Sequence, residues 1–150
     1  MLSVCRSYIP DFHAAEDCMI KAFVKIFRNI SSFKGVGSLE GWMRKIMVNE
    51  CLDNLKSTRK IYYLDEEYQD NFSDLDNEFY DFDVQELLDA LPENYRIVFN
   101  LFVLEDYSHK EISDLLHISE PTCRQQLKRA KAKLKELYLI NNKTQNEIKV

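Results

Sequence analysis

The stretch Tyr107–Ile140 (YSHKEISDLLHISEPTCRQQLKRAKAKLKELYLI) decides the fold that we predict for this chain. Ser108 and Glu111 are spaced as the two partners of a capping box, which fixes where a helix begins. A three-residue turn, 117–119, then leads into a second helix, and the last turn residue is its expected N-cap. Pro121 suits the first turn of that helix, where backbone N–H groups have no partner within the helix. The pattern predicts a helix-turn-helix that binds duplex DNA.

The second helix of this motif has one apolar stripe and one basic side. The stripe residues step by four or three positions: Cys123, Leu127, Ala130, Leu134 and Leu137. In the major groove Gln pairs with adenine and Arg with guanine, while flanking cations suit phosphates. A basic stripe alone is usually a solvated helix face, but this one follows a capped helix and a turn at helix-turn-helix spacing. We therefore expect DNA contacts from Ser119, Thr122, Arg124, Gln125, Gln126, Lys128, Arg129 and Lys133.

The composition favours a soluble, helical protein. The chain has 150 residues, 45% hydrophobic and 30% charged, with only 3 Gly and 3 Pro. No apolar run reaches the roughly 20 residues of a membrane span, and the N-terminus lacks the layout of a signal peptide. We therefore expect a cytoplasmic protein without direct membrane insertion.

The net charge of −5 is distributed unevenly. Residues 61–92 contain 11 acids and no base, whereas the flanking blocks 1–60 and 93–150 carry +4 and +2. Because like charges repel, such a block is usually flexible. The predicted layout is a first domain at 1–60, an acidic linker at 61–83, a second domain at 84–142 and a tail at 143–150. One hypothesis is that the linker screens the basic helix from DNA, so that neutralising its acids increases DNA binding.

Hydrophobic periodicity predicts two helices in the first domain. They are His13–Asn29, with Asp11 as its N-cap, and Leu39–Thr58, capped by Ser38. In the first of them the expected buried stripe comprises Met19, Ile20, Phe23, Ile26, Phe27 and Ile30.

The second domain adds two helices before the helix-turn-helix. They are Val84–Leu91 and, after Pro92, Glu93–Leu104, with Arg96 on its polar side. The predicted fold class is therefore all-α, with two small helical domains joined by an acidic linker and a winged-helix-like helix-turn-helix in the C-terminal one.

The four cysteines form no C-x-x-C pair, and each lies in an apolar helical pattern. The simplest interpretation is that they are small buried hydrophobic residues in a reducing compartment. A zinc site formed by Cys5, His13 and Cys18 is the alternative, although this spacing matches no common ligand pattern. No catalytic constellation is visible, so we expect neither an enzyme nor a cofactor.

Two parts of the chain resemble one protein family. The first contains Ala15-Glu16-Asp17, then Phe33, Gly37-Ser38-Leu39, Trp42, Arg44, Asn49 and Asp53. The second contains Leu87–Arg96 (LLDALPENYR), then Lys110-Glu111-Ile112, Leu116–Ser119, Leu127 and Arg129-Ala130. Their order and spacing resemble the sigma-70 family of bacterial RNA polymerase sigma factors, of the small extracytoplasmic-function (ECF) type. His117 replaces the family's Gly and is expected to adopt the left-handed αL conformation.

The resemblance implies a promoter-specificity factor with two reading domains. The first domain would bind the clamp helices of the polymerase beta-prime subunit and read the −10 element on melted DNA. The helix-turn-helix would read the −35 element and touch the beta flap, and an anti-sigma factor is an implied partner. Family members carry about one more helix before the Ala15 segment, so either the first domain is shortened or the chain is incomplete.

The resemblance also assigns residues within the first domain. The −10 and melting candidates are Phe33, Lys34, Trp42, Arg44, Lys45, Asn49 and Lys56. Packing in the core is the alternative for Phe33 and Trp42, whereas Asn49 is expected to be a polar residue in an otherwise apolar stripe. The polymerase-binding candidates are Asp17, Ile20, Lys21, Val24 and Phe27. Two other functions stay open: a stand-alone helix-turn-helix regulator, and an adaptor whose acidic linker engages a partner protein.

Overall fold

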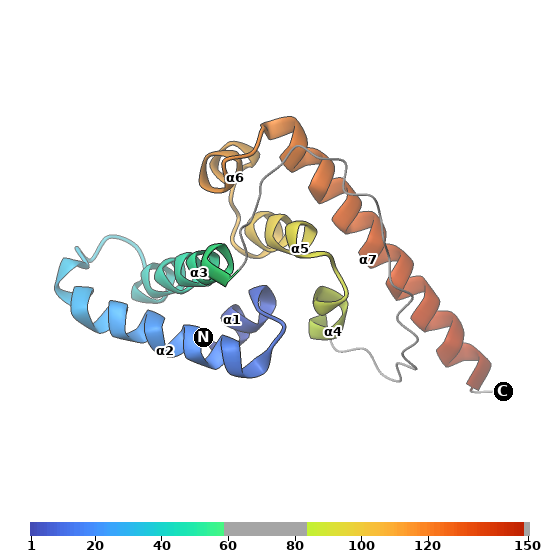
Figure 1. The fold of residues 1–150 in the computed structure, drawn as a ribbon, viewed down its shortest axis with the longest axis horizontal. Coiled ribbons are helices and arrows are strands. Elements are labelled where there is room, and N and C mark those ends of the chain that lie inside the picture. The colour runs from blue at the N-terminus through green and yellow to red at the C-terminus, as the bar shows by residue number, and fades with distance from the viewer. Residues whose placement is uncertain (59–83, 149–150) are drawn as a thin grey trace. The chain divides into compact units, whose positions relative to one another are not determined.

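The computed structural model describes residues 1–58 and 84–148, with side chains up to residues 57 and 140 (Figure 1). The chain divides into two units, Met1–Tyr62 and Tyr63–Val150. The predicted acidic linker at 61–83, its proposed screening role and the tail at 143–150 lie outside the residues whose side chains are described. The described residues are helical and contain no strand, so the all-α prediction is confirmed and no β-wing is present among them.

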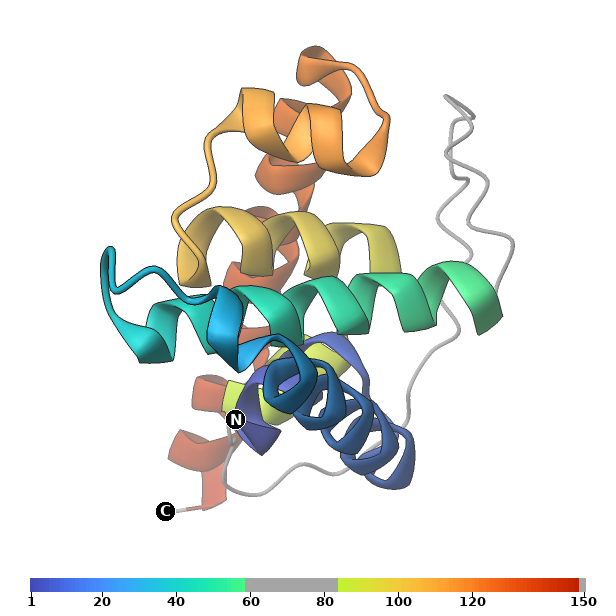
Figure 2. The ribbon, with the colours of Figure 1, turned by 90° about the vertical axis from the view of Figure 1, so that its left-hand side faces the viewer.

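The described residues of the first unit, 1–58, form three α-helices and a short 3₁₀ turn. The helices are α1 (Leu2–Tyr8), α2 (Phe12–Asn29) and α3 (Leu39–Thr58), with the 3₁₀ turn η1 at Ile30–Ser32. Helix α1 was not predicted and packs against both α2 and α3. Figures 1 and 2 together show that the axes of α2 and α3 cross steeply within this unit.

The helix starts in the first unit follow the predicted caps. The Asp11 carboxylate accepts a hydrogen bond from the backbone N–H of Ala14 at 2.8 Å, which begins α2. The Ser38 hydroxyl accepts one from the backbone N–H of Gly41 at 2.9 Å, which begins α3. Gly35 and Gly37 connect the two helices with φ of 71° and 79°, a conformation that glycine adopts without steric cost.

The buried side of α2 differs from the predicted stripe. Ala15, Cys18, Ala22 and Ile26 are buried, whereas Ile20 and Phe27 are 57% and 74% exposed. Of the predicted stripe only Ile26 is fully buried, so that prediction was wrong. The physical reason is that α2 is apolar on more than one side, and periodicity alone cannot choose between sides. The small residues allow α1 and α3 to approach closely, which leaves the larger ones outside.

The second unit contains α4 (Val84–Asp89), α5 (Glu93–Phe99), the wider π turn η2 (Asn100–Leu104), α6 (His109–Leu116) and α7 (Glu120–Ile148). Helices α4, α5 and α6 each pack against the long α7 (Figure 1). One cluster of the core comprises Leu88, Leu91, Tyr95 and Ala130, with Phe99 and Leu134 packed against it. Arg96 is only 4% exposed, so its predicted place on a polar side was wrong. None of the described helices is long and apolar enough to cross a membrane.

Candidate nucleic-acid interface

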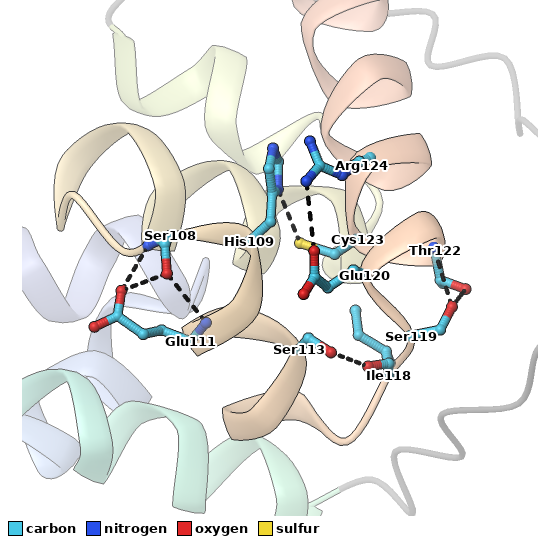
Figure 3. Close-up of polar contacts among 10 residues, drawn as sticks. All are labelled: Ser108, His109, Glu111, Ser113, Ile118, Ser119, Glu120, Thr122, Cys123 and Arg124. Carbon is cyan, nitrogen blue, oxygen red and sulfur yellow. Dashed lines mark hydrogen bonds and ion pairs between the residues drawn. The ribbon is translucent and has the colours of Figure 1, made fainter.

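The first helix of the predicted motif begins at a reciprocal capping box (Figure 3). The Ser108 hydroxyl accepts a hydrogen bond from the Glu111 backbone N–H at 3.2 Å, and the Glu111 carboxylate accepts one from the Ser108 N–H at 2.8 Å. These bonds satisfy two N–H groups that a helix start otherwise leaves without partners. The start of α6 is therefore fixed by residues that the sequence pattern had identified.

The turn between α6 and α7 is fixed by His117 and Ser113. His117 has φ 55° and ψ 41°, the αL conformation expected for it at the C-cap of α6. The Ser113 hydroxyl donates to the carbonyl oxygen of Ile118 at 2.5 Å, which ties the turn back to the helix before it (Figure 3). The Ser119 hydroxyl then accepts from the Thr122 N–H at 3.2 Å and caps α7. This turn sets the angle at which α7 leaves the motif.

The faces of α7 agree with the spacing argument. Cys123, Leu127 and Ala130 are buried, and Leu134 and Leu137 are half-buried. Of the predicted DNA-contacting residues, five are exposed: Ser119, Arg124, Gln125, Lys128 and Arg129. The other three are half-buried: Thr122, Gln126 and Lys133. The structure therefore places a mixed amide and cationic surface along the outer side of the second helix.

Some of these side chains also contact their own protein. Arg124 lies 3.4 Å from the Glu120 carboxylate, and Lys133 lies 3.1 Å from that of Glu136. Arg129 donates to the hydroxyl of Tyr95 on α5 at 3.2 Å. Gln125 and Lys128 lie among these pairs on the exposed side.

A packed cluster behind this surface joins η2, α6 and α7. The rings of His109 and Phe102 are stacked with centroids 4.6 Å apart, and His109 Nδ1 lies 3.4 Å from Cys123 Sγ (Figure 3 shows the latter contact). The ammonium of Lys131 lies 5.5 Å from the centroid of the Phe102 ring. Burial, and secondarily the charge of Arg124, lowers the pKa of His109. Burial raises the pKa of the Cys123 thiol, so both groups are held neutral at pH 7.

The first unit contains an aromatic pair where its loop meets α3. The rings of Phe33 and Trp42 lie with centroids 5.6 Å apart, and both residues are half-buried. Trp42, Lys45, Asn49 and Lys56 share one side of α3 by helical spacing, whereas Arg44 lies on the other side. Lys34, in the loop after Phe33, is exposed. The structure thus brings together all the −10 candidates on α3 except Arg44.

Asn49 does not occupy the position that the sequence predicted. It is exposed, and the polar residue within the buried side of α3 is Glu50, which is 8% exposed. Glu50 forms an ion pair with Lys25 of α2, and Asp53 lies 3.9 Å from the same ammonium. The pair raises the pKa of Lys25 and provides a cation for a buried carboxylate. Asn49 therefore lies on the outer surface, where a nucleic acid can reach it.

The predicted polymerase-binding residues lie on the outer side of α2. Asp17, Ile20, Lys21, Val24 and Phe27 are all exposed and recur at three or four positions. Ile20 and Phe27 had also been assigned to the core, and the structure places them outside. We call these five residues the outer face of α2. Three of them, Ile20, Val24 and Phe27, are large apolar residues exposed on one side of the helix.

The structure also joins three cysteines that the sequence did not connect. The thiols of Cys5, Cys18 and Cys51 lie within 4.8 Å of one another, and all three residues are buried. The side chain of His13 is 89% exposed, so the alternative site with His13 was wrong. Hydrogen bonds with Cys18 and Cys51 lower the pKa of Cys5. Hydrogen bonds with Cys18 and Cys5 raise the pKa of Cys51. Cys51 carried no sequence signal for this cluster because its partners are 33 or more residues away.

The sequence matches two family descriptions in the order of the chain. Sigma-70 region 2 matches residues 1–61, and Sigma-70, region 4 matches residues 81–134. The chain belongs to the sigma-70 family. Like the other members, this sigma factor directs core RNA polymerase to promoters.

Its similarity to ECF sigma factors extends over most of the chain. It is 25% identical over 138 residues to the ECF RNA polymerase sigma factor SigM of Bacillus subtilis (strain 168), covering 88% of this chain and 84% of SigM. It is 27% identical over 125 residues to the RNA polymerase sigma factor SigV of the same strain, covering 83% and 75%. The sigma factor RpoE, solved in complex with the anti-sigma factor NepR from Bartonella quintana, has the same fold. That likeness has a TM-score of 0.58 at 18% identity and covers 93% of this chain and 90% of the other.

Proposed function

We propose that the two units of this sigma factor read separate promoter elements, the second unit reading the −35 element as duplex DNA. The observation that carries the proposal is the capped α6, the αL turn at His117 and the exposed amide and cationic side of α7. Helices of this kind enter the major groove with their N-terminal half toward the base edges. Gln125 and Gln126 are then the base-reading residues, and Arg124 and Lys128 bind phosphates.

The first unit, in this proposal, reads the −10 element on melted DNA. Bases that leave the duplex stack on aromatic side chains beside a cationic surface. The Phe33 and Trp42 pair supplies the aromatic rings, and Lys34, Lys45 and Lys56 supply the charge. Asn49 adds an exposed amide that can hydrogen-bond to a base edge.

The outer face of α2 binds core RNA polymerase in this proposal, through the clamp helices of the beta-prime subunit. Its exposed apolar residues Ile20, Val24 and Phe27 suit burial against another helix, and Asp17 and Lys21 supply a polar rim. The second unit would contact the beta flap. The protein then acts without catalysis of its own, by positioning the polymerase.

An anti-sigma factor is a further proposed partner. The support is the solved complex of RpoE, which shares this fold, with the anti-sigma factor NepR. A protein that occupies the outer face of α2 or the exposed side of α7 would compete with polymerase or DNA. Co-purification of the full chain from its own cells, with and without added core polymerase, tests for such a competitor.

Run-off transcription with core polymerase tests the proposed function. Full-length protein and core polymerase are incubated with fragmented genomic DNA, and the transcript starts are sequenced. Discrete transcript starts that are each preceded by a shared −10 motif and a shared −35 motif support the proposal. Failure of the full-length protein to bind core polymerase would overturn it. A stand-alone regulator would instead give a clear footprint on duplex DNA without polymerase.

A further inference from the structure

Three cysteine thiols meet at one point in the core of the first unit. Cys5 comes from α1, Cys18 from α2 and Cys51 from α3, and each is fully buried at 0% exposure. Their sulfur atoms lie within 4.8 Å of one another, and those of Cys18 and Cys51 are 3.6 Å apart. These are all the cysteines in residues 1–62. Three helices therefore each direct their only thiol to the same place.

The spacing of the sulfur atoms suits a metal ion with three ligands. Metal–thiolate bonds are about 2.3 Å long, so a trigonal centre holds its sulfurs about 4.0 Å apart. The Cys18–Cys51 separation of 3.6 Å and the upper limit of 4.8 Å for all three pairs lie on either side of that value. Small shifts of side chains that already touch would be enough to bind an ion.

The ligand set indicates which class of ion fits. Structural zinc sites are almost always four-coordinate, and iron–sulfur clusters usually need four cysteines. Among the described residues the cluster contains three sulfurs and no His or carboxylate ligand. Soft thiolate ligands favour Cu(I), which accepts three of them. We propose that Cys5, Cys18 and Cys51 form a binding site for one Cu(I) ion.

The charge balance of binding is favourable on one side of the site. Each thiol loses its proton to solvent as one S–H bond breaks and one sulfur–copper bond forms, so three protons leave per ion. The resulting centre carries two negative charges. Lys21 follows Cys18 by three positions on α2, and its positive charge acts on the Cys18 thiol. Lys25 is already paired with Glu50, whose negative charge acts on the Cys5 thiol and opposes its ionisation. The positive charge of Lys21 lowers part of the cost of a buried anionic centre.

The site lies on the inner side of α2, away from its outer face. Cys18 and Ala22 are buried, while Ile20 and Phe27 on the same helix are exposed. A bound ion would connect α1, α2 and α3 without covering the surface that we assign to polymerase. Because the ion binds the folded state, it should raise the melting temperature of the first unit.

Anaerobic titration of the reduced full-length chain with Cu(I) tests this site. The competitor is a chromophoric Cu(I) chelator, and a near-ultraviolet thiolate-to-copper absorption band reports the bond. We expect one ion per chain, together with a higher melting temperature. Cys51→Ala should lower the affinity for Cu(I) about 100-fold or more. The loss of a residue that only hydrogen-bonds to a metal ligand already lowers metal affinity about 10- to 100-fold. Cys123→Ala is the matched control, because Cys123 is also fully buried but lies in the other unit.

The wild-type titration decides the question even if a variant fails to fold. If Cys51→Ala lacks the native circular dichroism spectrum, Cys5→Ala on the short α1 replaces it. A wild-type chain that releases all Cu(I) to the chelator overturns the site. So does a Cys5→Ala chain that is folded and keeps wild-type affinity, or tight Zn(II) binding by a chain that does not retain Cu(I).

Discussion

Arg129 on α7 donates a hydrogen bond to the hydroxyl of Tyr95 on α5, with the two atoms 3.2 Å apart. Tyr95 is 6% exposed and belongs to the core of the second unit, so its hydroxyl is the end of a buried ring. A residue on the side of α7 that we propose faces DNA is thereby oriented by the helix that supports it. Two kinds of measurement, stability and promoter preference, should both depend on this bond.

Tyr95→Phe is expected to lower the free energy of unfolding by about 1 kcal/mol, the usual net contribution of one hydrogen bond. The ring keeps its packing, and only the acceptor for Arg129 is lost. Urea unfolding followed by circular dichroism measures the change. Tyr138→Phe is the control, since Tyr138 is 57% exposed on the same α7. Equal effects of the two substitutions would contradict a role for the Arg129 bond.

Two neighbouring substitutions on α7 should distinguish the recognition of bases from the binding of phosphates. Gln125→Ala removes an amide that we propose reads a base, and is expected to relax the preference at one −35 position, by about 1–3 kcal/mol. Lys128→Ala removes a proposed phosphate contact, so activity should fall at all promoters and the salt slope should decrease by about 1. Transcription from a library of randomised −35 elements, at two salt concentrations, measures both. An unchanged preference in Gln125→Ala would remove that residue from the reading face.

Adjacent residues of α2 should separate polymerase binding from stability. Phe27 is 74% exposed, so Phe27→Ala should weaken binding to core polymerase about 10-fold or more with little loss of stability. Ile26 is 2% exposed, so Ile26→Ala should lower the free energy of unfolding by about 2–5 kcal/mol. Fluorescence anisotropy with labelled protein measures the affinity, and urea unfolding measures the stability. The assignment of the outer face fails if Phe27→Ala binds polymerase as tightly as the wild type.

His109 should make the second unit less stable in acid. Burial lowers its pKa in the folded state, so the unfolded chain binds the proton more readily. The free energy of unfolding should be constant above about pH 6.5, the unfolded pKa, and should decrease as the pH falls toward the folded pKa. An NMR titration of the His109 ring should give a midpoint below that of an unstructured peptide. His109→Phe, which keeps a ring against Phe102, should reduce the slope. A midpoint at or above the peptide value would contradict this cause.

The helix-turn-helix could be predicted closely because its signals are local. Ser108, Glu111 and Ser119 make bonds to backbone atoms three residues away, so their spacing alone identifies the helix starts. The αL turn at His117 was expected from the family resemblance, because His117 stands where the family has Gly, and the structure confirms it. The outer side of α7 was found by helical spacing, because Cys123, Leu127 and Ala130 form one narrow buried stripe.

The first unit was harder to predict because its core depends on distant residues. On α2 the periodicity predicted that the larger apolar residues are buried, but α1 and α3 cover Ala15, Cys18 and Ala22 instead. The ion pair of Lys25 with Glu50 and the meeting of three cysteines connect different helices, and no spacing within one helix reveals them. Asn49 was misplaced for the same reason.

The small residues on the inner side of α2 also have a geometric consequence. Ala15 and Ala22 lie where α2 meets its neighbours, and α2 carries its outer face while α3 carries Trp42 and Asn49. The thickness of the unit is thus set where its side chains are shortest. A single added methyl group at Ala22 would alter the distance between the surface proposed for polymerase and the surface proposed for the DNA strand. The size of these two alanines therefore sets the distance between the two proposed surfaces, although neither residue needs to touch the polymerase or the DNA.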